Sequence, residues 1–457
     1  MKQRIFMILA GSVILIIGVA YMVMPRGPEW TTKSLEALAE LDAAWDAAQK
    51  LYGQEARGHL EKALALDPDF VIAKLRLAEL ERHENSERAT KLLAEVRQAD
   101  LKKLKPREAF LVERALLVED GKWKEAAEAL DAFFAEHPDD PQILYVKAMD
   151  DWMNGRLAPS EKLFSRLLEI RPNWVIAYNQ LGYISMIQGR FSKAEEYFTS
   201  YRFIAPDQAN PHDSLGELYV LIGRWEEAEV SFRKALEVKP EFGASMGHMA
   251  ALDALRGRWG DAGKWIDLAE STGAYRADYA HSFRCNLEFW QLVAHQDWES
   301  VLREAAGDCD PRKSPVARSA VLFHEAACRL GRWDPAEAIE TELRSRVENM
   351  PASNSAWFDV RQSMLDHLRG IRLSAQGEPG EAVRALEKAD QGLVYLNMEV
   401  GLFKLSNRLA LVGVLQSEGK ETESRSWLEK VRKVNPAFTE SWEQGPPRVW
   451  EGEPVSR

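Results

Sequence analysis

Three copies of the tripeptide GRW occur in the sequence, at residues 223–225, 257–259 and 331–333. Two of their glycines belong to a series with a constant spacing of 34 residues: Gly121, Gly155, Gly189, Gly223 and Gly257. A second series has the same spacing: Pro138, Pro172, Pro206 and Pro240. A fixed period of this length indicates that one structural unit has been copied along the chain.

Three further places in the unit keep one kind of side chain. Counting from each glycine, the second residue is large and apolar (Trp123, Leu157, Phe191, Trp225, Trp259), the fifth is small (Ala126, Ser160, Ala194, Ala228, Ala262), and the ninth is again large and apolar (Leu130, Phe164, Phe198, Phe232, Ile266). The pattern predicts two helices per unit. Glycine ends the first helix in a left-handed conformation, the small residue allows close helix packing, and proline ends the second helix. We expect the arginine of GRW on an exposed turn and the tryptophan buried.

A helix-turn-helix unit with these residues in this order resembles the tetratricopeptide repeat. The resemblance is closest in VIAYNQLGYISMIQGRFSKAEEYFTSYRFIAP (Val175–Pro206) and in ANPHDSLGELYVLIGRWEEAEVSFRKALEVKP (Ala209–Pro240). The central block also resembles the repeat domains that follow a membrane span in bacterial serine/threonine kinases and winged-helix activators. The resemblance implies an all-α solenoid, a right-handed superhelix of helix pairs, and protein binding as its function. Because only a four-residue tail precedes the predicted span described next, we expect neither a kinase nor a DNA-binding domain.

The N-terminus reads IFMILAGSVILIIGVAYMVM over residues 5–24, without a charged residue. Twenty helical residues span about 30 Å, the thickness of a bilayer's hydrocarbon core. We expect one uncleaved transmembrane helix here. A cleaved signal peptide with a site at Gly18-Val19-Ala20 is the alternative. With Lys2 and Arg4 before the span, we expect a single-pass inner-membrane protein whose body is periplasmic.

These patterns predict six segments. They are a transmembrane anchor (1–25), a linker (26–33), degenerate repeats (34–104), a regular repeat block (105–270), irregular repeat-like helices (271–438) and an extended tail (439–457).

Composition limits the function further. The 457 residues are 46% hydrophobic and 28% charged with a net charge of -12, which indicates a folded body and argues against nucleic-acid binding. No motif for a cofactor, a metal ion or a small-molecule substrate is found, and we expect none. The three cysteines, Cys285, Cys309 and Cys328, form no CxxC. A Cys309–Cys328 disulfide and buried free thiols are both open.

Two local patterns suggest chemistry. Gly243-Ala244-Ser245-Met246-Gly247 fits the G-x-S-x-G nucleophile elbow, but that elbow needs a preceding strand, and here the context is helical. Asp308 and Asp310 flank Cys309, and we interpret them as a solvated turn because further metal ligands are not evident. We therefore predict a protein that is not an enzyme, with a hydrolase using Ser245 as the least favoured reading.

The binding surface is expected on the inner wall of the solenoid, which the first helices form. Places 2, 5, 9 and 12 of each first helix share one face. The predicted partner-binding groove consists of Gln142, Tyr145, Met149, Trp152, Ile176, Asn179, Tyr183, Met186, Asn210, Asp213, Glu217 and Val220. One end of this groove is aromatic and sulfur-bearing, and the other is acidic. Such a surface suits a peptide with apolar anchors and a basic residue at one end.

The sequence thus predicts a membrane-anchored, non-catalytic scaffold or adaptor that binds a partner protein or peptide in its concave groove. The alternative is an accessory assembly subunit of an envelope enzyme or an export complex, in which the convex surface contributes equally.

Overall fold

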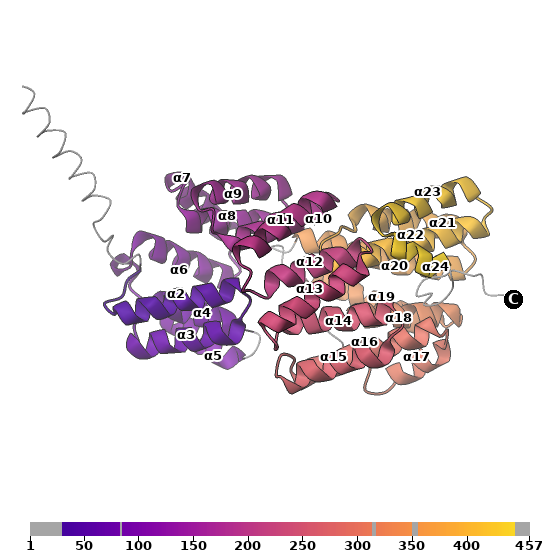
Figure 1. The fold of residues 1–457 in the computed structure, drawn as a ribbon, viewed down its shortest axis with the longest axis horizontal. Helices are drawn as coiled ribbons and strands as arrows, with labels where there is room; N and C mark the ends of the chain where they lie inside the picture. The colour runs from indigo at the N-terminus through magenta and orange to yellow at the C-terminus, as the bar shows by residue number, and fades with distance from the viewer. Residues whose placement is uncertain (1–29, 83–84, 313–316, 350–354, 444–457) are drawn as a thin grey trace, which may run out of the picture. The chain divides into compact units, whose positions relative to one another are not determined.

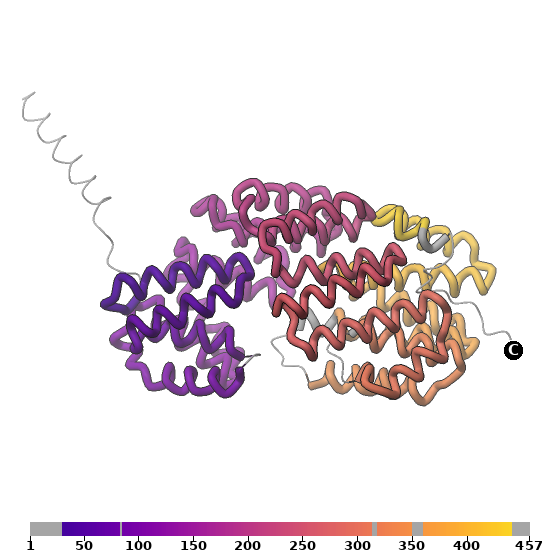
Figure 2. Tube along the Cα trace, turned by 60° about the horizontal axis from the view of Figure 1, so that its bottom comes forward, coloured from indigo at the N-terminus to yellow at the C-terminus, as the bar shows by residue number. Residues whose placement is uncertain are grey.

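The computed structural model describes residues 30–82, 85–312, 317–349 and 355–443. Every regular element in these ranges is a helix (Figure 1), as the sequence predicts for an all-α array. Most consecutive helices pack in pairs, for example α2 with α3, α10 with α11 and α22 with α23. The course of the Cα trace in Figure 2 shows these pairs following one another along the chain.

The described residues form two compact units, which divide between Ala135 and Glu136. The first contains α2 (Leu35–Gln49), α3 (Gly53–Leu66), α4 (Val71–Glu81), α5 (Ser86–Arg97), the 3-10 helix η1 (Leu101–Lys103), α6 (Pro106–Glu119) and nearly all of α7 (Trp123–Glu136).

The second unit contains α8 (Pro141–Met153), α9 (Leu157–Ile170), α10 (Val175–Ile187), α11 (Phe191–Ile204), α12 (Asn210–Leu221), α13 (Trp225–Val238), α14 (Gly243–Leu255), α15 (Trp259–Ser271), α16 (Ala277–Ala294), α17 (Trp298–Ala305), α18 (Ala317–Arg329), α19 (Trp333–Glu348), α20 (Ser355–Ala375), α21 (Pro379–Gly392), α22 (Met398–Ser417), α23 (Glu421–Val434) and α24 (Pro436–Glu443). Helix α24 continues to Glu443, although the sequence predicts an extended tail from residue 439. The rest of that tail lies outside the described residues.

The joint between the helices of a pair has one recurring backbone geometry. In the α12–α13 joint, Gly223 has a φ of 82°. The amide of Gly223 donates to the carbonyl of Val220 at 3.2 Å, and the amide of Arg224 donates to that of Tyr219 at 2.8 Å. These two bonds form the Schellman motif, which needs the left-handed conformation that glycine adopts without strain. The other four glycines of the series have a φ of 71°, so the predicted role of the glycine is confirmed.

Close packing within a pair depends on the small residue of the first helix and the ninth-place residue of the second. A methyl group added to Gly182 would lie 2.3 Å from the ring of Phe198, and one added to Gly216 would lie 2.3 Å from the ring of Phe232. Both rings are fully buried. The glycines therefore leave the space that the phenyl rings fill, and the contact fixes how closely the two helices approach.

The tryptophans of GRW are less buried than the sequence predicts. Trp225, Trp259 and Trp333 are half-buried, and Trp123 is 37% exposed. The core of each pair is formed instead by the ninth-place residues, which are at most 2% exposed. Replacing one of these tryptophans by alanine should consequently cost less than the roughly 3–5 kcal/mol typical of a fully buried indole.

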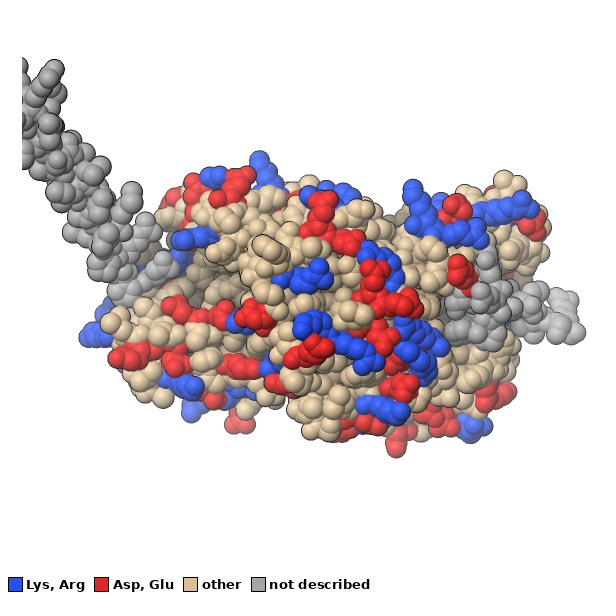
Figure 3. All heavy atoms as spheres, viewed as in Figure 1, with Lys and Arg blue, Asp and Glu red and all other residues tan. Residues whose placement is uncertain are grey.

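The arginines of the joints link neighbouring pairs. Three of them form an ion pair with a glutamate on the second helix of the preceding pair: Arg190 with Glu161 at 2.8 Å, Arg224 with Glu195 at 2.8 Å, and Arg258 with Glu229 at 3.4 Å. Basic and acidic side chains are accordingly interspersed on the face that Figure 3 shows. Exposed pairs of this kind contribute at most about 1 kcal/mol each, so they assist the stacking of pairs without determining it.

Within the second unit, α22 packs against α12, although nearly 200 residues separate them in the sequence. Met398, Leu402, Leu405 and Leu409 form one apolar stripe of α22 and belong to the same buried cluster as Leu221 at the end of α12. The contact is close, since a methyl group added to Gly401 of α22 would lie 2.6 Å from the Leu221 side chain.

A side chain from the last joint of the unit completes this contact. The Asn435 amide group donates to the carbonyls of Val220 and Leu221, at 3.1 and 3.0 Å, and its own oxygen accepts from the amide of Phe438 at 2.8 Å. Those two carbonyls end α12, where a helix has few donors of its own for its last carbonyls, so Asn435 adds to the bond that Val220 already accepts from Gly223. Asn435 is fully buried, and every residue of α12 is buried as well.

The membrane-spanning part of the predicted fold is corrected. Among the described residues, the structure contains no helix with the length and apolar character needed to cross a bilayer. The two longest helices, α20 and α22, carry charged residues such as Asp366, Arg372 and Lys404, which a bilayer core disfavours. The span predicted at residues 5–24 lies outside the described residues. A single-pass inner-membrane protein with a periplasmic body is thus not supported, and the fold class is an all-α array of helix pairs.

Replacing Gly216 by alanine should destabilise the fold, because the added methyl group clashes with the Phe232 ring. We expect the free energy of unfolding to fall by about 1–3 kcal/mol, the usual effect of overpacking a core, as measured by urea denaturation followed by circular dichroism.

Gly263→Ala is the matched control, since Gly263 is also helical and a methyl group there would meet no atom within 4 Å. We expect this control to leave stability unchanged or to raise it by up to about 1 kcal/mol. Equal effects of the two substitutions would contradict the assigned role of Gly216.

Candidate functional site

The candidate site is the face predicted from the sequence, which we call the first-helix face; it comprises the twelve predicted groove residues on α8, α10 and α12. The structure divides it in two. Gln142, Tyr145, Met149, Trp152 and Tyr183 are partly exposed, whereas Ile176, Asn179, Met186, Asn210, Asp213, Glu217 and Val220 are buried.

The α8 end of the first-helix face is aromatic. The Tyr145 ring lies 6.3 Å from that of Phe164 in an edge-on arrangement and 6.0 Å from that of Trp174. Phe164 is fully buried in the same helix pair, so the tyrosine has a rigid support. Met149 lies one helical turn further along α8, on the same side. This end therefore combines apolar surface with partial exposure.

The α12 end holds a buried polar network instead of an open acidic surface. The Tyr183 hydroxyl donates to Glu217 at 2.5 Å, and the Ser245 hydroxyl donates to Asp213 at 2.6 Å. His248 of α14 lies between the two carboxylates, with Nδ1 3.0 Å from Asp213 and Nε2 3.1 Å from Glu217. The network joins three consecutive helix pairs, so these side chains hold the pairs together.

His248 is charged in this network. Burial lowers the pKa of its imidazole, but the two carboxylates outweigh burial and raise this pKa well above its ordinary value. Each ring nitrogen can then donate to one carboxylate, which requires the doubly protonated ring. One of the two negative charges that the sequence assigns to this end of the groove is thus compensated inside the protein.

Ser245 is a hydrogen-bond donor in this network and is not arranged as a nucleophile. Its side chain is fully buried in α14, and its hydroxyl proton is directed to Asp213. His248 donates to the same carboxylate through Nδ1, so the imidazole presents no lone pair to the serine. The imidazole is therefore not available as a general base for the Ser245 hydroxyl.

The α12 end is also closed by the chain itself. Helix α22 and Asn435 cover the C-terminal part of α12, as described above, and the Tyr395 ring just before α22 packs edge-on against Phe191 at 5.1 Å. A sequence search along the first helices could not find this cover, because it comes from the opposite end of the unit. The partly exposed side chains of α8 and α10 are what remains of the predicted surface.

The structure also contains a disulfide that the sequence analysis did not predict. Cys285 forms a disulfide with Cys309 across a sequence separation of 24 residues, so the predicted alternative Cys309–Cys328 is wrong. Cys328 is a buried free thiol. His281 lies beside the disulfide and is one helical turn before Cys285. The four-residue spacing of His281 and Cys285 indicates that they share one helix face. The cluster could not be predicted from it, because its third member, Cys309, lies in a separate loop.

Comparison with protein families identifies the repeat. Tetratricopeptide repeat models match residues 116–174, 175–200 and 212–243. These segments contain four of the five glycine joints of the series, and the units there are tetratricopeptide repeats, as the sequence pattern predicts. A search of curated proteins finds no match.

Solved structures with a similar fold include a tetratricopeptide repeat protein from Parabacteroides merdae, at 15% identity and a TM-score of 0.37, covering 55% of this chain and 98% of that one. The Cut9–Hcn1 hetero-tetramer of the APC/C is similar at 14% identity and a TM-score of 0.48, covering 91% and 76%. Pseudomonas aeruginosa pilF is similar at 14% identity and a TM-score of 0.34, covering 48% of this chain and 96% of that one. Likenesses of this size carry no functional argument.

The raised pKa of His248 predicts a pH dependence of stability. The folded state holds the proton more tightly than the unfolded chain, whose histidine pKa is about 6.5. The stabilisation is therefore complete below about pH 6.5 and is lost as the pH rises through the folded-state pKa. We expect urea denaturation to show a free energy of unfolding that falls as the pH rises above about 6.5.

In His248→Gln this part of the pH dependence should disappear, whereas His295→Gln, outside the network, should retain it. Identical pH profiles for the wild type and His248→Gln would show that the histidine is not held charged between the two carboxylates.

Proposed function

We propose that the chain is a non-catalytic scaffold that binds a segment of a partner protein on the exposed part of the first-helix face, namely Gln142, Tyr145, Met149, Trp152 and Tyr183. The tetratricopeptide repeats support protein binding as the general function. The observation that carries the proposal is the division of the predicted face, in which partial exposure is confined to α8 and to Tyr183 of α10.

The chemistry of this surface favours a partner with apolar anchors. Tyrosine and tryptophan supply large, rigid contact areas with a polar tip, and methionine adapts to irregular shapes. The acidic residues that suggested a basic anchor, Asp213 and Glu217, are buried and bonded to His248. We infer that the partner segment is an amphipathic helix or an extended strand with large apolar side chains, and that a basic residue is not required.

The non-catalytic part of the proposal is supported by the contacts of Ser245. Its proton is directed to a carboxylate, and the neighbouring histidine is engaged with both nitrogens. In this reading Ser245 fastens α14 to α12. Its replacement should reduce stability and leave peptide binding at α8 unaffected.

Selection from a displayed random-peptide library on the full chain tests the binding surface. We expect the enriched peptides to carry aromatic or large aliphatic residues at intervals of three or four, as in a helix, or at every second position, as in a strand. Tyr145→Ala combined with Met149→Ala should weaken the best peptide at least about tenfold, in line with the loss of anchor contacts at the centre of an interface. Fluorescence anisotropy of the labelled peptide measures the dissociation constant.

The matched control is Phe203→Ala combined with Val230→Ala. These apolar residues lie on the second helices α11 and α13 and are 85% and 68% exposed, so they test a surface elsewhere on the same unit. We expect unchanged peptide affinity in this control. A peptide that binds the α8 variant as tightly as the wild type, or that loses affinity in the control, would contradict the proposed surface.

A further inference from the structure

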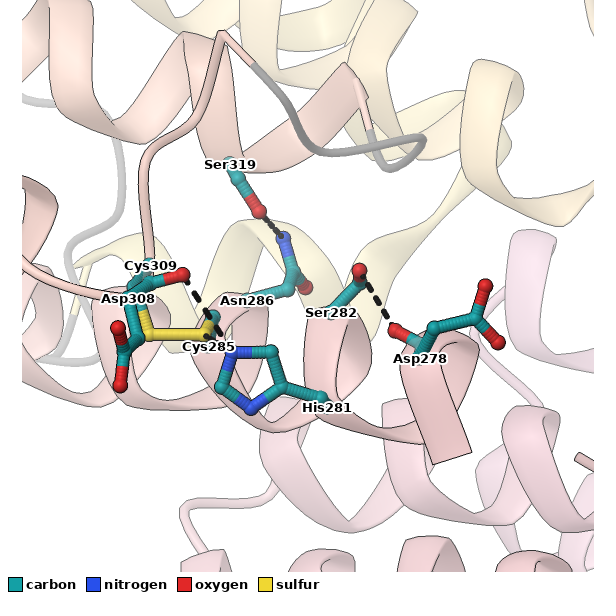
Figure 4. The surroundings of a disulfide bond; sticks show 8 residues. All are labelled: Asp278, His281, Ser282, Cys285, Asn286, Asp308, Cys309 and Ser319. Atoms are coloured by element: carbon teal, nitrogen blue, oxygen red, sulfur yellow. Dashed lines mark hydrogen bonds between the residues drawn. A yellow bond between two sulfur atoms is a disulfide. The ribbon is translucent and has the colours of Figure 1, made fainter. Parts of the chain in front are cut away.

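A cluster of metal-ligating side chains lies outside the first-helix face. His281 and Cys285 are one turn apart on α16, and Cys309 belongs to the segment that follows α17. The imidazole nitrogen and the two sulfur atoms all lie within 4.8 Å of one another. Figure 4 shows the His281 ring directed at the disulfide that joins the two cysteines.

The cluster is accessible from solvent on one side. His281 is exposed and Cys309 is half-buried, whereas Cys285 is 4% exposed. The imidazole also contacts the carbonyl of Asp308, 3.4 Å from Nε2. A reductant or a metal ion can thus reach the bond from the loop side, while α16 holds two of the three groups on a rigid helix.

The distances fit a zinc ion once the disulfide is reduced. A thiolate and an imidazole bound to one tetrahedral Zn²⁺, at about 2.3 and 2.0–2.1 Å, lie about 3.6 Å apart. In the structure the Cys285 sulfur lies 3.6 Å from Nε2 of His281. Two thiolates on one zinc lie about 3.8 Å apart, compared with about 2 Å in a disulfide, so Cys309 must move by roughly 2 Å.

We propose that His281, Cys285 and Cys309 form a redox-gated zinc site, closed by the disulfide under oxidising conditions and open to one Zn²⁺ when the disulfide is reduced. Two thiolates and an imidazole are ligands that favour zinc over magnesium or calcium. Three protein ligands leave a fourth position, which water fills. The segment around Cys309 then has two arrangements, selected by the thiol redox state and by zinc.

A dithiol can act as the reductant that opens the site. The dithiol gives two electrons and two protons to the Cys285–Cys309 bond and becomes a disulfide itself, which leaves two protein thiols. Zinc then binds both sulfur atoms and displaces the two thiol protons, while neutral His281 supplies the lone pair of Nε2. In the reverse direction an external disulfide exchanges with the two thiolates, takes up the two electrons together with two protons from water to become a dithiol, and leaves the Cys285–Cys309 bond re-formed and the ion released.

A second histidine–cysteine pair in the chain provides an internal comparison. His324 and Cys328 have the same spacing on α18, and the sulfur lies 3.7 Å from Nδ1. This pair is fully buried, and Nε2 of His324 is bonded to Glu340 at 3.0 Å. Among the described residues, no third ligand atom lies close enough to both side chains to complete a metal site there. The pair lacks the third ligand and serves as a control.

Zinc binding to the full chain tests the proposal directly. The protein is reduced with dithiothreitol, freed of reductant under nitrogen, and titrated with Zn²⁺ in competition with a chromophoric chelator. We expect the reduced wild type to bind about one Zn²⁺ per chain and the oxidised wild type to bind at least about 100-fold more weakly. Co²⁺ as a second probe should give the absorption of a tetrahedral thiolate complex in the reduced protein alone.

Three substitutions locate the ligands, with circular dichroism confirming that helix content is retained. Cys285→Ser and His281→Asn should each weaken zinc binding by the reduced chain at least about tenfold, whereas Cys328→Ala should leave it unchanged. Failure of the reduced wild type to bind zinc would overturn the proposal, whatever its helix content. Equal binding by the oxidised and reduced wild type, or loss of binding in Cys328→Ala, would also overturn it.

Discussion

The left-handed glycine at the end of the first helix of each regular repeat is the constraint on which the rest of the structure depends. It closes the helix with the same two hydrogen bonds in each copy, and it turns the chain at the same place in each unit. Because the turn is constant, the small residue of the first helix meets the ninth-place residue of the second, as Gly216 meets Phe232. The same turn places Arg224 beside Glu195 of the preceding pair. Packing within a pair and contact between pairs therefore follow from one backbone conformation.

Repetition alone would give an open wall of first helices, and the second unit departs from this expectation. The apolar stripe of α22 and the Asn435 side chain bind the end of α12, and the charged network around His248 ties α12 to its neighbours. These interactions stabilise the unit and remove α12 from the available surface. The surface that a partner can contact is consequently limited by a long-range contact within the unit.

The local part of the fold could be predicted from the sequence. Gly189 and Phe198 occupy fixed positions in the 34-residue repeat, and those positions predict that Gly189 ends a helix and that Phe198 packs in the core of the pair. The partial exposure of Trp225 was not predictable, because the ninth-place ring fills the core before the indole reaches it. The contact of Asn435 with Val220 could not be predicted either, because a repeat pattern gives no information on a contact between residues 215 apart in the sequence. The same applies to Cys309, which meets Cys285 through an irregular loop. Sequence reasoning thus identified the unit and missed the contacts that repetition does not generate.

The most direct measurement of the central constraint is the stability of substitutions at Gly189, where φ is 71° and a methyl group would meet no atom within 4 Å. Only the backbone conformation then opposes a side chain. Gly189→Ala should lower the free energy of unfolding by about 1–2 kcal/mol, and Gly189→Asn should lower it less, because asparagine adopts the left-handed conformation more readily. Urea denaturation of the two variants and the wild type measures these free energies of unfolding. An alanine variant as stable as the wild type would contradict the account.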